Sequence, residues 1–494
     1  MGAAGHAEIE VKYAVDERAV LPDLATVPGV ATVVRLEPMR LEAVYFDTAD
    51  RVLVRARIAL RRRTGGHDAG WHVKLPAAVG RTEVQAPIDP ERPDVLPGVL
   101  RELLATRIRT SPLEPIARVA TERIATVLRD ASGAGAVEVV DDRVTATDVA
   151  AGVVRTWREW EVEQVGEDAE ASAALLAATD PVLQAAGARV SPSPAKLAQA
   201  LGGERTEPVA AATTAGEVVR RIVGRLAEQL HRDVAALRSG GADEVHAARK
   251  TVRRIRSVLA LEDVTGEAGR ALRQQLRSLG ATLGDARDPV VAARVSAELL
   301  AGLGDDVPEA VRRRLVDDRL ADAEAARVRA LGALDSAAGS AAFAALDAFA
   351  AATPTGPRAT ASVPVLADLA RSTVRRAVRR TRHADRSLQA LHDARRAAKR
   401  ARYVIEELEA EGALRSGSAL RRSARRAAAV HRTIGAHRDL ELLVADLPFV
   451  AARAAANGEN AFSYGVLAER GARRARRLRR KAKHAMDRLR AIAR

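Results

Sequence analysis

The first third of the chain alternates apolar and polar residues with a period of two, in short stretches separated by Gly, Pro and Asp. Successive side chains of a β-strand point to opposite faces, so this alternation predicts strands that are buried on one face only. The stretches follow one another closely between residues 8 and 165, which favours an antiparallel sheet or barrel. The strands are expected at EIEVKYAV, LEAVYFDT, RIALRRR, WHVKLP, TERIATVLR, AVEVVDDRVTA and REWEVEQV.

Helical patterns interrupt these strands and then take over the chain. PDLATVP, DVLPGVLRELLAT and EASAALLAATDPVLQAAG predict helices between strands. From Val218 onward, Leu, Val and Ala recur at heptad-like spacing with Arg, Glu and Asp between them, which predicts helices. The breaker-rich segment 202–217 separates the two patterns and is the expected linker. We therefore predict an α+β protein with two domains, residues 1–201 and 218–494.

An internal repeat divides the helical part. The stretch VHAARKTVRRIRSVL, from Val245, aligns without a gap with LHDARRAAKRARYVI, from Leu391. Further along each copy, LGDARD (283–288) corresponds to IGAHRD (434–439). Two landmarks in the same order indicate a duplicated helical bundle. The repeat halves are expected at about 218–350 and 364–494.

The first landmark of each copy is a histidine followed by cations at the same offsets. Offsets 0, 3, 4 and 7 lie on one stripe of an α-helix, where like charges repel and destabilise the helix. A bound anion would relieve that repulsion, and Arg and Lys are suited to phosphate oxygens. A solvated basic face is the alternative, which the gapless duplication disfavours. The candidate residues are His246, Arg249, Lys250, Arg253, Arg254, His392, Arg395, Arg396, Lys399 and Arg400.

Other polar residues of the helical part have structural explanations. Asp288 and Asp439 follow the arginine of the second landmark. We expect each to pair with that arginine or with the basic helix. The histidines without a counterpart in the other copy are expected to be packed helix residues; they are His231, His383, His431 and His437.

Charge is distributed unevenly along the chain. The formal net charge is +15, but residues 1–200 hold 24 Lys and Arg against 29 Asp and Glu, whereas residues 201–494 hold 55 against 35. A basic domain attracts polyanions such as nucleic acid, anionic membranes or polyphosphate. Aromatic residues are only 2% of the chain, which argues against recognition of single-stranded nucleic acid by base stacking. The absence of Cys excludes disulfides, thiolate zinc sites and cysteine nucleophiles.

Carboxylates alternate on one face of the first predicted strand, at Glu8 and Glu10, and of the last, at Glu159, Glu161 and Glu163. Neighbouring carboxylates repel unless a cation intervenes, and all-oxygen ligand sets suit Mg²⁺ or Mn²⁺. A metal–triphosphate ligand needs such carboxylates together with basic residues that neutralise the remaining phosphate oxygens. A solvated face is the alternative for any single strand of this kind. Cations alternate likewise on the strands, at Lys12, Arg61, Arg63, Lys74 and Arg123.

Over residues 215–494 the sequence resembles the CHAD family, the conserved-histidine α-helical domains. The resemblance rests on the two His-x-x-Arg helices and the two Gly-x-x-Arg-Asp segments. It implies two four-helix bundles that bind inorganic polyphosphate along a basic channel.

Over residues 6–201 the sequence resembles the CYTH family, the triphosphate tunnel metalloenzymes. The matches are the ExExK signature, Tyr-Phe-Asp-Thr (45–48), Leu-Arg-x-Arg (60–63), the Lys74 strand, Arg123 and a closing Lys196. The resemblance implies an eight-stranded antiparallel tunnel that uses a divalent cation. In that tunnel Glu8, Glu10, Glu161 and Glu163 would hold the metal, and Lys12, Arg61, Arg63, Lys74, Arg123 and Lys196 would bind the triphosphate.

The sequence leaves two questions open, the register of one strand and the choice of acidic residues on another. Arg62, between Arg61 and Arg63, makes the register of its strand ambiguous. AVEVVDDR offers rival acidic positions at Glu138, Asp141 and Asp142. These three are not assigned to the site.

We therefore expect a metal-dependent phosphohydrolase that acts on triphosphate, with Mg or Mn as cofactor and Glu8, Glu10 and Lys12 as catalytic residues. One alternative is a non-catalytic polyphosphate-binding protein, and another is adenylate cyclase chemistry, which the CYTH family includes. Nucleic acid is not expected as a specific ligand. The start of the chain lacks an apolar leader, and no run of about 18 apolar residues occurs, so we expect a soluble cytoplasmic protein without a membrane partner. Association with polyphosphate granules is a further expectation.

Overall fold

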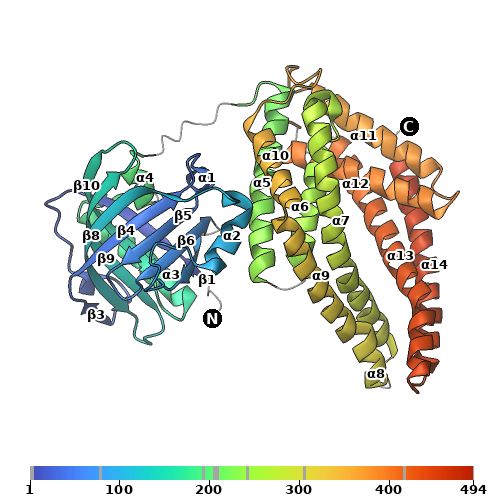
Figure 1. The fold of residues 1–494 in the computed structure, drawn as a ribbon, viewed down its shortest axis with the longest axis horizontal. Helices are drawn as coiled ribbons and strands as arrows, with labels where there is room; N and C mark the ends of the chain where they lie inside the picture. Colours follow the sequence, from blue (N-terminus) through green and yellow to red (C-terminus); the bar gives the residue numbers. More distant parts are fainter. Residues whose placement is uncertain are drawn as a thin grey trace. The chain divides into compact units, whose positions relative to one another are not determined.

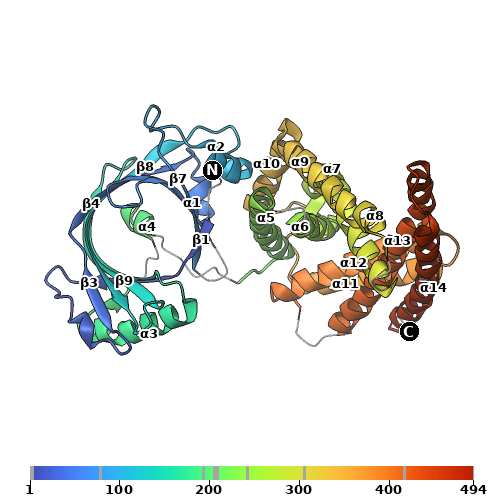
Figure 2. The same ribbon diagram turned by 90° about the horizontal axis from the view of Figure 1, so that it is seen from below.

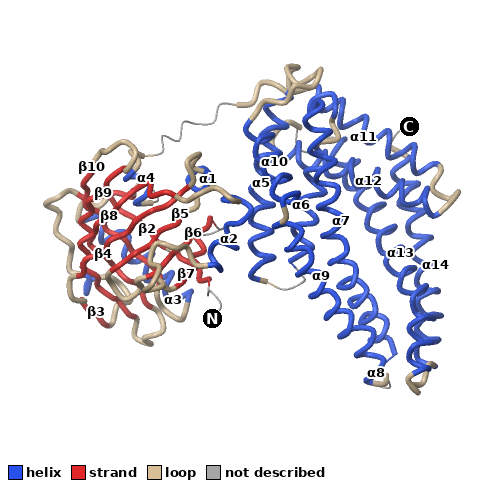
Figure 3. Tube along the Cα trace, in the orientation of Figure 1, coloured by secondary structure: helices blue, strands red, loops and turns tan. Residues whose placement is uncertain are grey.

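The computed structural model describes residues 5–76, 80–191, 195–203, 211–240, 244–303, 307–414 and 419–492. The chain divides into two compact units, Met1–Val209 and Ala210–Arg494. Figure 3 separates them by secondary structure, with strands confined to the first unit and helices filling the second. The α+β class with two domains is therefore as the sequence predicted. No helix in the described ranges is long and apolar enough to cross a membrane.

The N-terminal unit is built on one antiparallel sheet. Each stretch predicted as a strand overlaps a strand of this sheet. Three further strands, β3, β7 and the short β11, were not predicted. The strands are β1 (Gly5–Glu8), β2 (Glu10–Val15), β3 (Thr32–Arg35), β4 (Met39–Asp47), β5 (Ala59–Thr64), β6 (Gly70–Pro76), β7 (Arg81–Ala86), β8 (Glu114–Arg129), β9 (Ala136–Asp148), β10 (Val154–Gln164) and β11 (Arg189–Val190).

The sheet curls into a ring because its first strand is shared between both ends. The strand order is β1-β7-β6-β5-β4-β8-β9-β10-β2-β11, with β3 paired to β8. Only Ile9 separates β1, which pairs with β7, from β2, which pairs with β10. Counting β1 and β2 as one strand, and leaving aside the short β3 and β11, eight staves surround the tunnel that the family resemblance implied (Figure 2).

The large apolar side chains of β6 and β10 point outward, under covering helices. Trp71 of β6 packs with Leu100 of helix α2 (Gly98–Ile108), and Trp160 of β10 packs with Leu175 of α3 (Ala169–Ala185). Alternation then directs the intervening polar residues of β6 and β10 into the ring. Because the apolar clusters lie outside, the interior is free to be charged.

Shorter helices complete this unit. PDLATVP forms only the 3-10 turn η1 (Leu24–Thr26), whereas the other two predicted helices are α2 and α3. The four-residue helix α1 (Val52–Arg55) follows β4. Helix α4 (Lys196–Ala200) lies inside the ring (Figure 2), with Leu197 packed among apolar residues of β4, β5 and β8.

The C-terminal unit is entirely helical where it is described. Helix α5 begins at Ala215, within the segment 202–217 expected as linker, because Thr214 and Glu217 form a capping box there. The helices are α5 (Ala215–Ser239), α6 (Val245–Val258), α7 (Glu262–Leu300), α8 (Glu309–Arg312), α9 (Asp318–Asp335), α10 (Ala337–Ala351), α11 (Val365–Arg382), α12 (Leu388–Ala410), α13 (Ala419–Ala456) and α14 (Phe462–Arg490).

The two sequence repeats form two similar sets of helices that share a core. The repeated landmarks fall on α6 and α7 in the first set and on α12 and α13 in the second (Figure 1). Helices α6 and α12 contact each other, and one continuous apolar cluster contains residues from both sets. Much of that cluster is alanine, such as Ala248 and Ala398, which lets helix backbones approach closely. The basic helices of the two repeats are thereby brought face to face.

We predict that Asp47 is required to hold the end of β4. This carboxylate is fully buried and accepts hydrogen bonds from the backbone N–H groups of Thr48 (2.7 Å), Leu53 (2.9 Å) and Val54 (2.9 Å). Asp47→Ala should lower the free energy of unfolding by about 2–3 kcal/mol, because these donors lose their partner. Urea denaturation measures this loss. Asp50→Ala, at an exposed neighbour, is the control, and an equal loss in both variants would contradict the assignment.

Candidate functional site

Charged side chains from around the ring line a single cavity of about 290 Å³. Every N-terminal residue predicted for the site lies on its wall, although strands far apart in sequence contribute them. Those residues are Glu8, Glu10, Lys12, Arg61, Arg63, Lys74, Arg123, Glu161, Glu163 and Lys196.

Strand register explains how the first and last strands combine. In the β2–β10 pairing, Glu10 lies opposite Glu163 and Lys12 lies opposite Glu161. The Lys12 ammonium forms an ion pair with Glu161 and another with Glu10, at 2.8 Å. A cation thus faces a carboxylate across the pairing at Lys12 and Glu161, whereas two carboxylates face each other at Glu10 and Glu163.

The carboxylates at one part of the cavity are only partly neutralised. Glu8 is buried and forms an ion pair with Lys74, yet its second oxygen has no hydrogen-bond partner among the residues that the structure describes. Burial, and then the negative charges of Glu8, Glu10 and Glu161, raise the pKa of Glu163 to about 7. An unpartnered buried oxygen beside carboxylates that repel one another fits a divalent cation with oxygen ligands. Glu8, Glu10 and Glu163 are the residues that could hold it.

Glu161 has a different environment from the other predicted metal ligands. Burial opposes its ionisation, but Lys12, Lys196 and Arg123 outweigh this and hold the pKa of Glu161 well below its usual value. Arg123 donates to Glu161 at 3.1 Å. Glu161 therefore lies between the carboxylates that could hold a metal and the cations of the cavity.

Lys196 enters the cavity from helix α4 rather than from the sheet. Its ammonium lies 2.9 Å from Asp142, 2.5 Å from Glu159 and 2.6 Å from Glu161. Carboxylate oxygens of these three residues lie within 4.8 Å of one another, close enough to hold an ion, and Lys196 supplies the positive charge in this structure. Arg123 also grips Asp142 through two hydrogen bonds, of 2.8 and 2.7 Å.

The basic wall is formed by β5 and its neighbours. Arg61 and Arg63 face the cavity, whereas Arg62 points outward to an ion pair with Asp94, which settles the register of that strand. Burial, Arg61 and Arg123 lower the pKa of Arg63 to about 9. Close packing of these guanidinium groups creates an excess of positive charge that a phosphate chain would neutralise.

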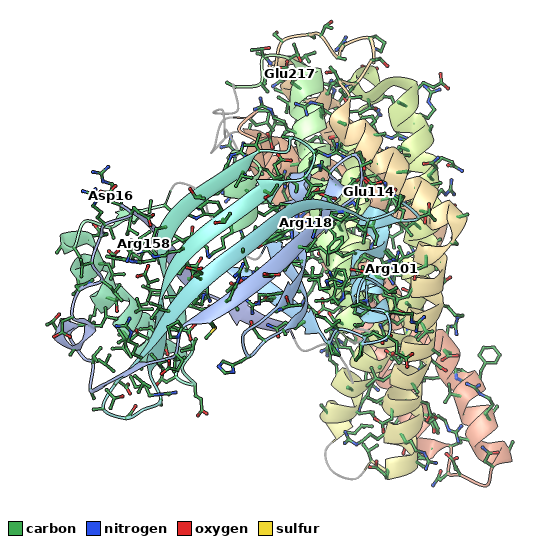
Figure 4. All side chains as sticks on the ribbon, turned by 60° about the vertical axis from the view of Figure 1, so that its left-hand side comes forward. Asp16, Arg101, Glu114, Arg118, Arg158 and Glu217 are labelled. Carbon is green, nitrogen blue, oxygen red and sulfur yellow. The ribbon has the colours of Figure 1, made fainter. Side chains whose placement is uncertain are left out.

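The three acidic residues of β9 that the sequence left open lie on different faces of that strand. Asp141 points outward and binds Arg158 at 2.8 and 2.6 Å (Figure 4 labels Arg158). Glu138 lines the cavity, and Asp142 is buried against Arg123 and Lys196. Alternation along AVEVVDDR could have identified Asp142 as the inward residue once the face of Glu138 was known.

Other lining residues were missed in the sequence. Arg81 and Glu83 lie on β7, whose alternating RTEVQA was not recognised as a strand. Glu83 approaches Arg61 (3.5 Å) and Lys74 (3.9 Å), and it hydrogen-bonds to His72 (2.8 Å). Tyr45, in the Tyr-Phe-Asp-Thr motif, lines the cavity too. Although burial disfavours ionisation of its hydroxyl, Arg61, Lys74 and Lys196 lower the pKa of Tyr45.

In the helical unit, the glycine of each Gly-x-x-Arg-Asp segment lies against an arginine of the basic helix in the same repeat. A Cβ atom on Gly284 would lie 3.2 Å from a terminal guanidinium nitrogen of Arg249, and one on Gly435 would lie 3.2 Å from that of Arg395. Each arginine therefore rests against a helix that only glycine leaves open. The repeated Gly-x-x-Arg-Asp segments thus position the repeated arginines.

Cations from both repeats converge where α6 contacts α12, and we term this set the inter-repeat channel, after the basic channel that the family resemblance implies. The set consists of Arg249, Arg253 and Arg287 of the first repeat with Arg395, Lys399 and Arg438 of the second. Burial and the charges of Arg253, Arg395 and Arg249 hold the pKa of Lys399 well below its usual value. Burial and Arg253 also lower the pKa of Arg249 to about 10. Within the described ranges, the buried Nε atoms of Arg249, Arg253, Arg287 and Arg395 have no hydrogen-bond partner.

The other predicted residues of these helices have varied positions. Lys250 and Arg396 are exposed, and Arg396 forms an ion pair with Asp393. Arg254 lies away from the channel cations, in an ion pair with the buried Glu407 at 2.5 Å. Arg400 lies among Arg376, Arg273 and Arg256. His246 and His392 lie at the Arg287 and Arg438 end, where burial and nearby arginines lower the pKa of each.

Three channel residues were read only as structural in the sequence. Arg287 and Arg438 belong to the second landmark, and Arg287 lies 3.4 Å from Asp288 and 3.6 Å from Asp439. His431, expected to be an ordinary packed residue, faces the channel cations, and neither of its ring nitrogens has a hydrogen-bond partner in the part of the chain that is described. Burial, Arg395 and Lys399 lower the pKa of His431 to about 2. The first repeat has no histidine at the corresponding position, so comparison of the two repeats did not select His431.

Comparison with known proteins matches both units. A family model described as the CYTH domain matches residues 6–182, and one described as the CHAD domain matches residues 221–448. An uncharacterized protein of Mycobacterium tuberculosis (strain CDC 1551 / Oshkosh) is 34% identical over 519 aligned residues, which cover 98% of this chain and 97% of that protein. A protein from a second strain of that species gives the same values.

Solved structures also match parts of the chain. PptA from Streptomyces chartreusis is 19% identical, with a TM-score of 0.44 over 56% of this chain and 100% of that chain. The CHAD domain from the plant Ricinus communis is 24% identical, with a TM-score of 0.43 over 56% and 93%. A putative adenylyl cyclase from Hippeastrum, described as having a dominant triphosphatase activity, is 17% identical, with a TM-score of 0.26 over 40% and 95%.

We predict that Glu163 destabilises the metal-free protein as pH rises. Its pKa is about 7 in the folded chain, above the reference value of 4.5, so the folded state binds more protons between these values. Stability contributed below pH 4.5 is therefore lost as pH rises through 7. In EDTA, the free energy of unfolding of Glu163→Gln should exceed that of the wild type by about 1–2 kcal/mol at pH 8 and by much less at pH 5.

Thermal unfolding of the N-terminal unit at several pH values tests this. Excess Mn²⁺ should remove the advantage of Glu163→Gln, because the wild type gains a ligand that the variant has weakened. Glu122→Gln, on the outward face of β8, is the control. A pH-independent difference between wild type and Glu163→Gln would contradict the assignment.

Proposed function

Because the chain belongs to the proteins that join a CYTH domain to a CHAD domain, we propose that its N-terminal unit hydrolyses inorganic triphosphate or a related triphosphate compound, using Mg or Mn. We also propose that its helical unit binds inorganic polyphosphate. CYTH proteins include triphosphatases and adenylate cyclases. The observation that carries the hydrolase proposal is the cavity in which partly neutralised carboxylates lie beside closely packed cations.

A divalent cation held by Glu8, Glu10 and Glu163 would polarise phosphate oxygens and activate a bound water. Glu161 borders this set and is fixed by Lys12 and Arg123. Carboxylates of β1, β2 and β10 would thus hold the cation in a fixed place relative to the basic wall.

The chain's own cations would bind and orient the triphosphate. Arg61, Arg63 and Lys74 project from adjacent strands, so their donors would contact successive phosphate groups. Lys12 and Lys196 would exchange carboxylate partners for phosphate oxygens without leaving the cavity. Positioning and charge neutralisation account for most of the catalysis in phosphoryl transfer, and this wall supplies both.

In the helical unit, a chain of phosphates would lie along the inter-repeat channel. Its oxygens would accept hydrogen bonds from the guanidinium groups of Arg249, Arg253, Arg287 and Arg395, whose buried Nε atoms have no partner among the described residues. These groups are held in place without a ligand, since Gly284 and Gly435 seat two of them. A preorganised row of donors favours a linear polyanion.

We predict that Glu8→Gln/Glu10→Gln abolishes release of phosphate from tripolyphosphate. Loss of two metal-binding carboxylates should lower kcat/KM by at least about a hundredfold, more than loss of residues that merely orient ligands. The matched control is Glu114→Gln/Glu122→Gln, whose side chains are exposed on β8 (Glu114 is labelled in Figure 4). Phosphate release with Mg²⁺ and with Mn²⁺ measures the effect.

The same assay separates the alternatives. Equal rates for the double variant and the wild type, or no release from any triphosphate tested, would leave only binding in the N-terminal unit. Formation of cyclic AMP from ATP by the wild type, in place of phosphate release, would favour cyclase chemistry.

We predict that Gly284→Ala/Gly435→Ala weakens polyphosphate binding by roughly three- to tenfold, because each added methyl displaces an arginine that binds phosphate. Alanine has a higher helix propensity than glycine, so the helices should remain folded. The control is Gly332→Ala/Gly465→Ala, at helix positions where an added Cβ meets nothing within 4 Å. Titration calorimetry measures affinity, and equal affinities of the two double variants would contradict the proposed channel.

A further inference from the structure

Basic charge is concentrated in the second repeat. Residues 364–494 hold 32 Lys and Arg against 13 Asp and Glu, whereas residues 218–350 hold 21 against 19. The inter-repeat channel draws on both repeats alike and so does not account for this difference. Most of the additional cations lie elsewhere, on the outer faces of α11, α13 and α14.

A groove between α13 and α14 gathers part of this excess. The groove, of about 320 Å³, is lined by four arginines and two alanines: Arg422, Arg425, Arg426, Ala429, Ala485 and Arg488. No carboxylate belongs to this lining. Its small alanines leave the guanidinium groups room to converge, so the groove has the chemistry of an anion site.

The groove arginines have little to neutralise them. Arg422, Arg425 and Arg488 form no ion pair within the described part of the chain. Arg426 donates to the backbone carbonyl of Arg488 at 2.7 Å, which fixes it at the groove without cancelling its charge. Like charges at offsets of three and four destabilise a helix, as on α6 and α12.

Exposed cations continue the basic surface along α14. Arg477 and Lys481, on the face of α14 that carries Ala485 and Arg488, are exposed and form no ion pair among the described residues. At a rise of about 1.5 Å per residue, the stretch from Arg477 to Arg488 is roughly 16 Å long. The surface is therefore extended rather than a single point charge.

This groove is separate from the inter-repeat channel. On α13, the arginines Arg422, Arg425 and Arg426 lie roughly a quarter to a half turn around the helix from Gly435, which faces the channel. It also has no equivalent in the first repeat. The register that matches Gly284 with Gly435 places Ala271, Gln274 and Gln275 at the corresponding positions of α7.

We propose that the groove between α13 and α14 is a second binding site for phosphate chains, which engages long polyphosphate outside the inter-repeat channel. This inference rests on the proposed polyphosphate binding and extends it. A narrow groove between two helices suits a single flexible chain, whereas the phosphates of a wide duplex would meet only its rim. The lining contains no aromatic residue on which unpaired bases could stack. Chains long enough to occupy both sites gain affinity through effective concentration.

The test compares full-length Arg422→Gln/Arg425→Gln with Arg313→Gln/Arg329→Gln. The control pair is exposed in the first repeat, is not ion-paired among the described residues, and removes the same charge. Binding of long-chain and short-chain polyphosphate is measured across a range of salt concentrations in EDTA. The groove variant should bind long chains about tenfold more weakly than the control. Its slope of log affinity against log salt should fall by roughly one unit or more.

Short chains distinguish the groove from the channel. Their affinity should be unchanged in the groove variant and reduced in Gly284→Ala/Gly435→Ala. Long-chain affinity equal to that of the control would overturn the groove site, as would an equal loss for short and long chains. If only Gly284→Ala/Gly435→Ala behaves as the wild type, the channel proposal fails while the groove stands. Selective loss of duplex DNA binding in the groove variant, with polyphosphate binding intact, would reassign the surface to nucleic acid and sink the proposal.

Discussion

Like charges held at close quarters are the constraint on which both units depend. In the tunnel, Glu8, Glu10 and Glu163 lie near one another, and burial together with their mutual repulsion raises the pKa of Glu163. In the helical unit, Arg253 and Lys399 share one channel, and the pKa of Lys399 is lowered correspondingly. A packed scaffold must hold such groups together, since they would separate if left free. The unrelieved charge is what makes each site receptive to a ligand of opposite sign.

The two scaffolds solve this problem by different means. The sheet turns its apolar side chains outward beneath α2 and α3, so the cohesive part of the unit surrounds the charged interior. The helical unit instead packs alanine-rich helices closely and uses Gly284 and Gly435 to seat arginines against them. In both cases apolar packing a short distance away fixes the charged groups. This arrangement places donors before the ligand arrives, which lowers the cost of ordering them on binding.

Compensation within each site also differs. In the tunnel, Glu161 forms ion pairs with Lys12, Arg123 and Lys196. Removal of any one of these charges would therefore leave a buried charge that is no longer fully compensated. The inter-repeat channel has few carboxylates, chiefly Asp288 and Asp439 at the arginines of the second landmark. The tunnel therefore suits a ligand that brings both metal and phosphate, whereas the channel suits an anion alone. The groove on α13 and α14 resembles the channel in this respect.

Sequence alone determined the two-domain class, the repeat and the faces on which charged residues alternate, because these follow from local periodicity. Period two placed Glu8, Glu10 and Glu161 on inward faces, and the gapless repeat singled out Arg249 and Arg395. Tertiary structure decided which faces meet. Ring closure through Ile9 joined the first strand to β7 and β10, and α4 carried Lys196 to carboxylates far along the chain.

Other assignments depended on neighbours that no local pattern contains. Arg62 points outward because Asp94 lies there, and Arg254 leaves the channel for the buried Glu407. His431 joins the channel although the first repeat has no equivalent histidine. Periodicity fixes the direction of a side chain relative to its own helix or strand. Burial, pairing and pKa depend on what packs against that helix or strand, and only the folded chain specifies this.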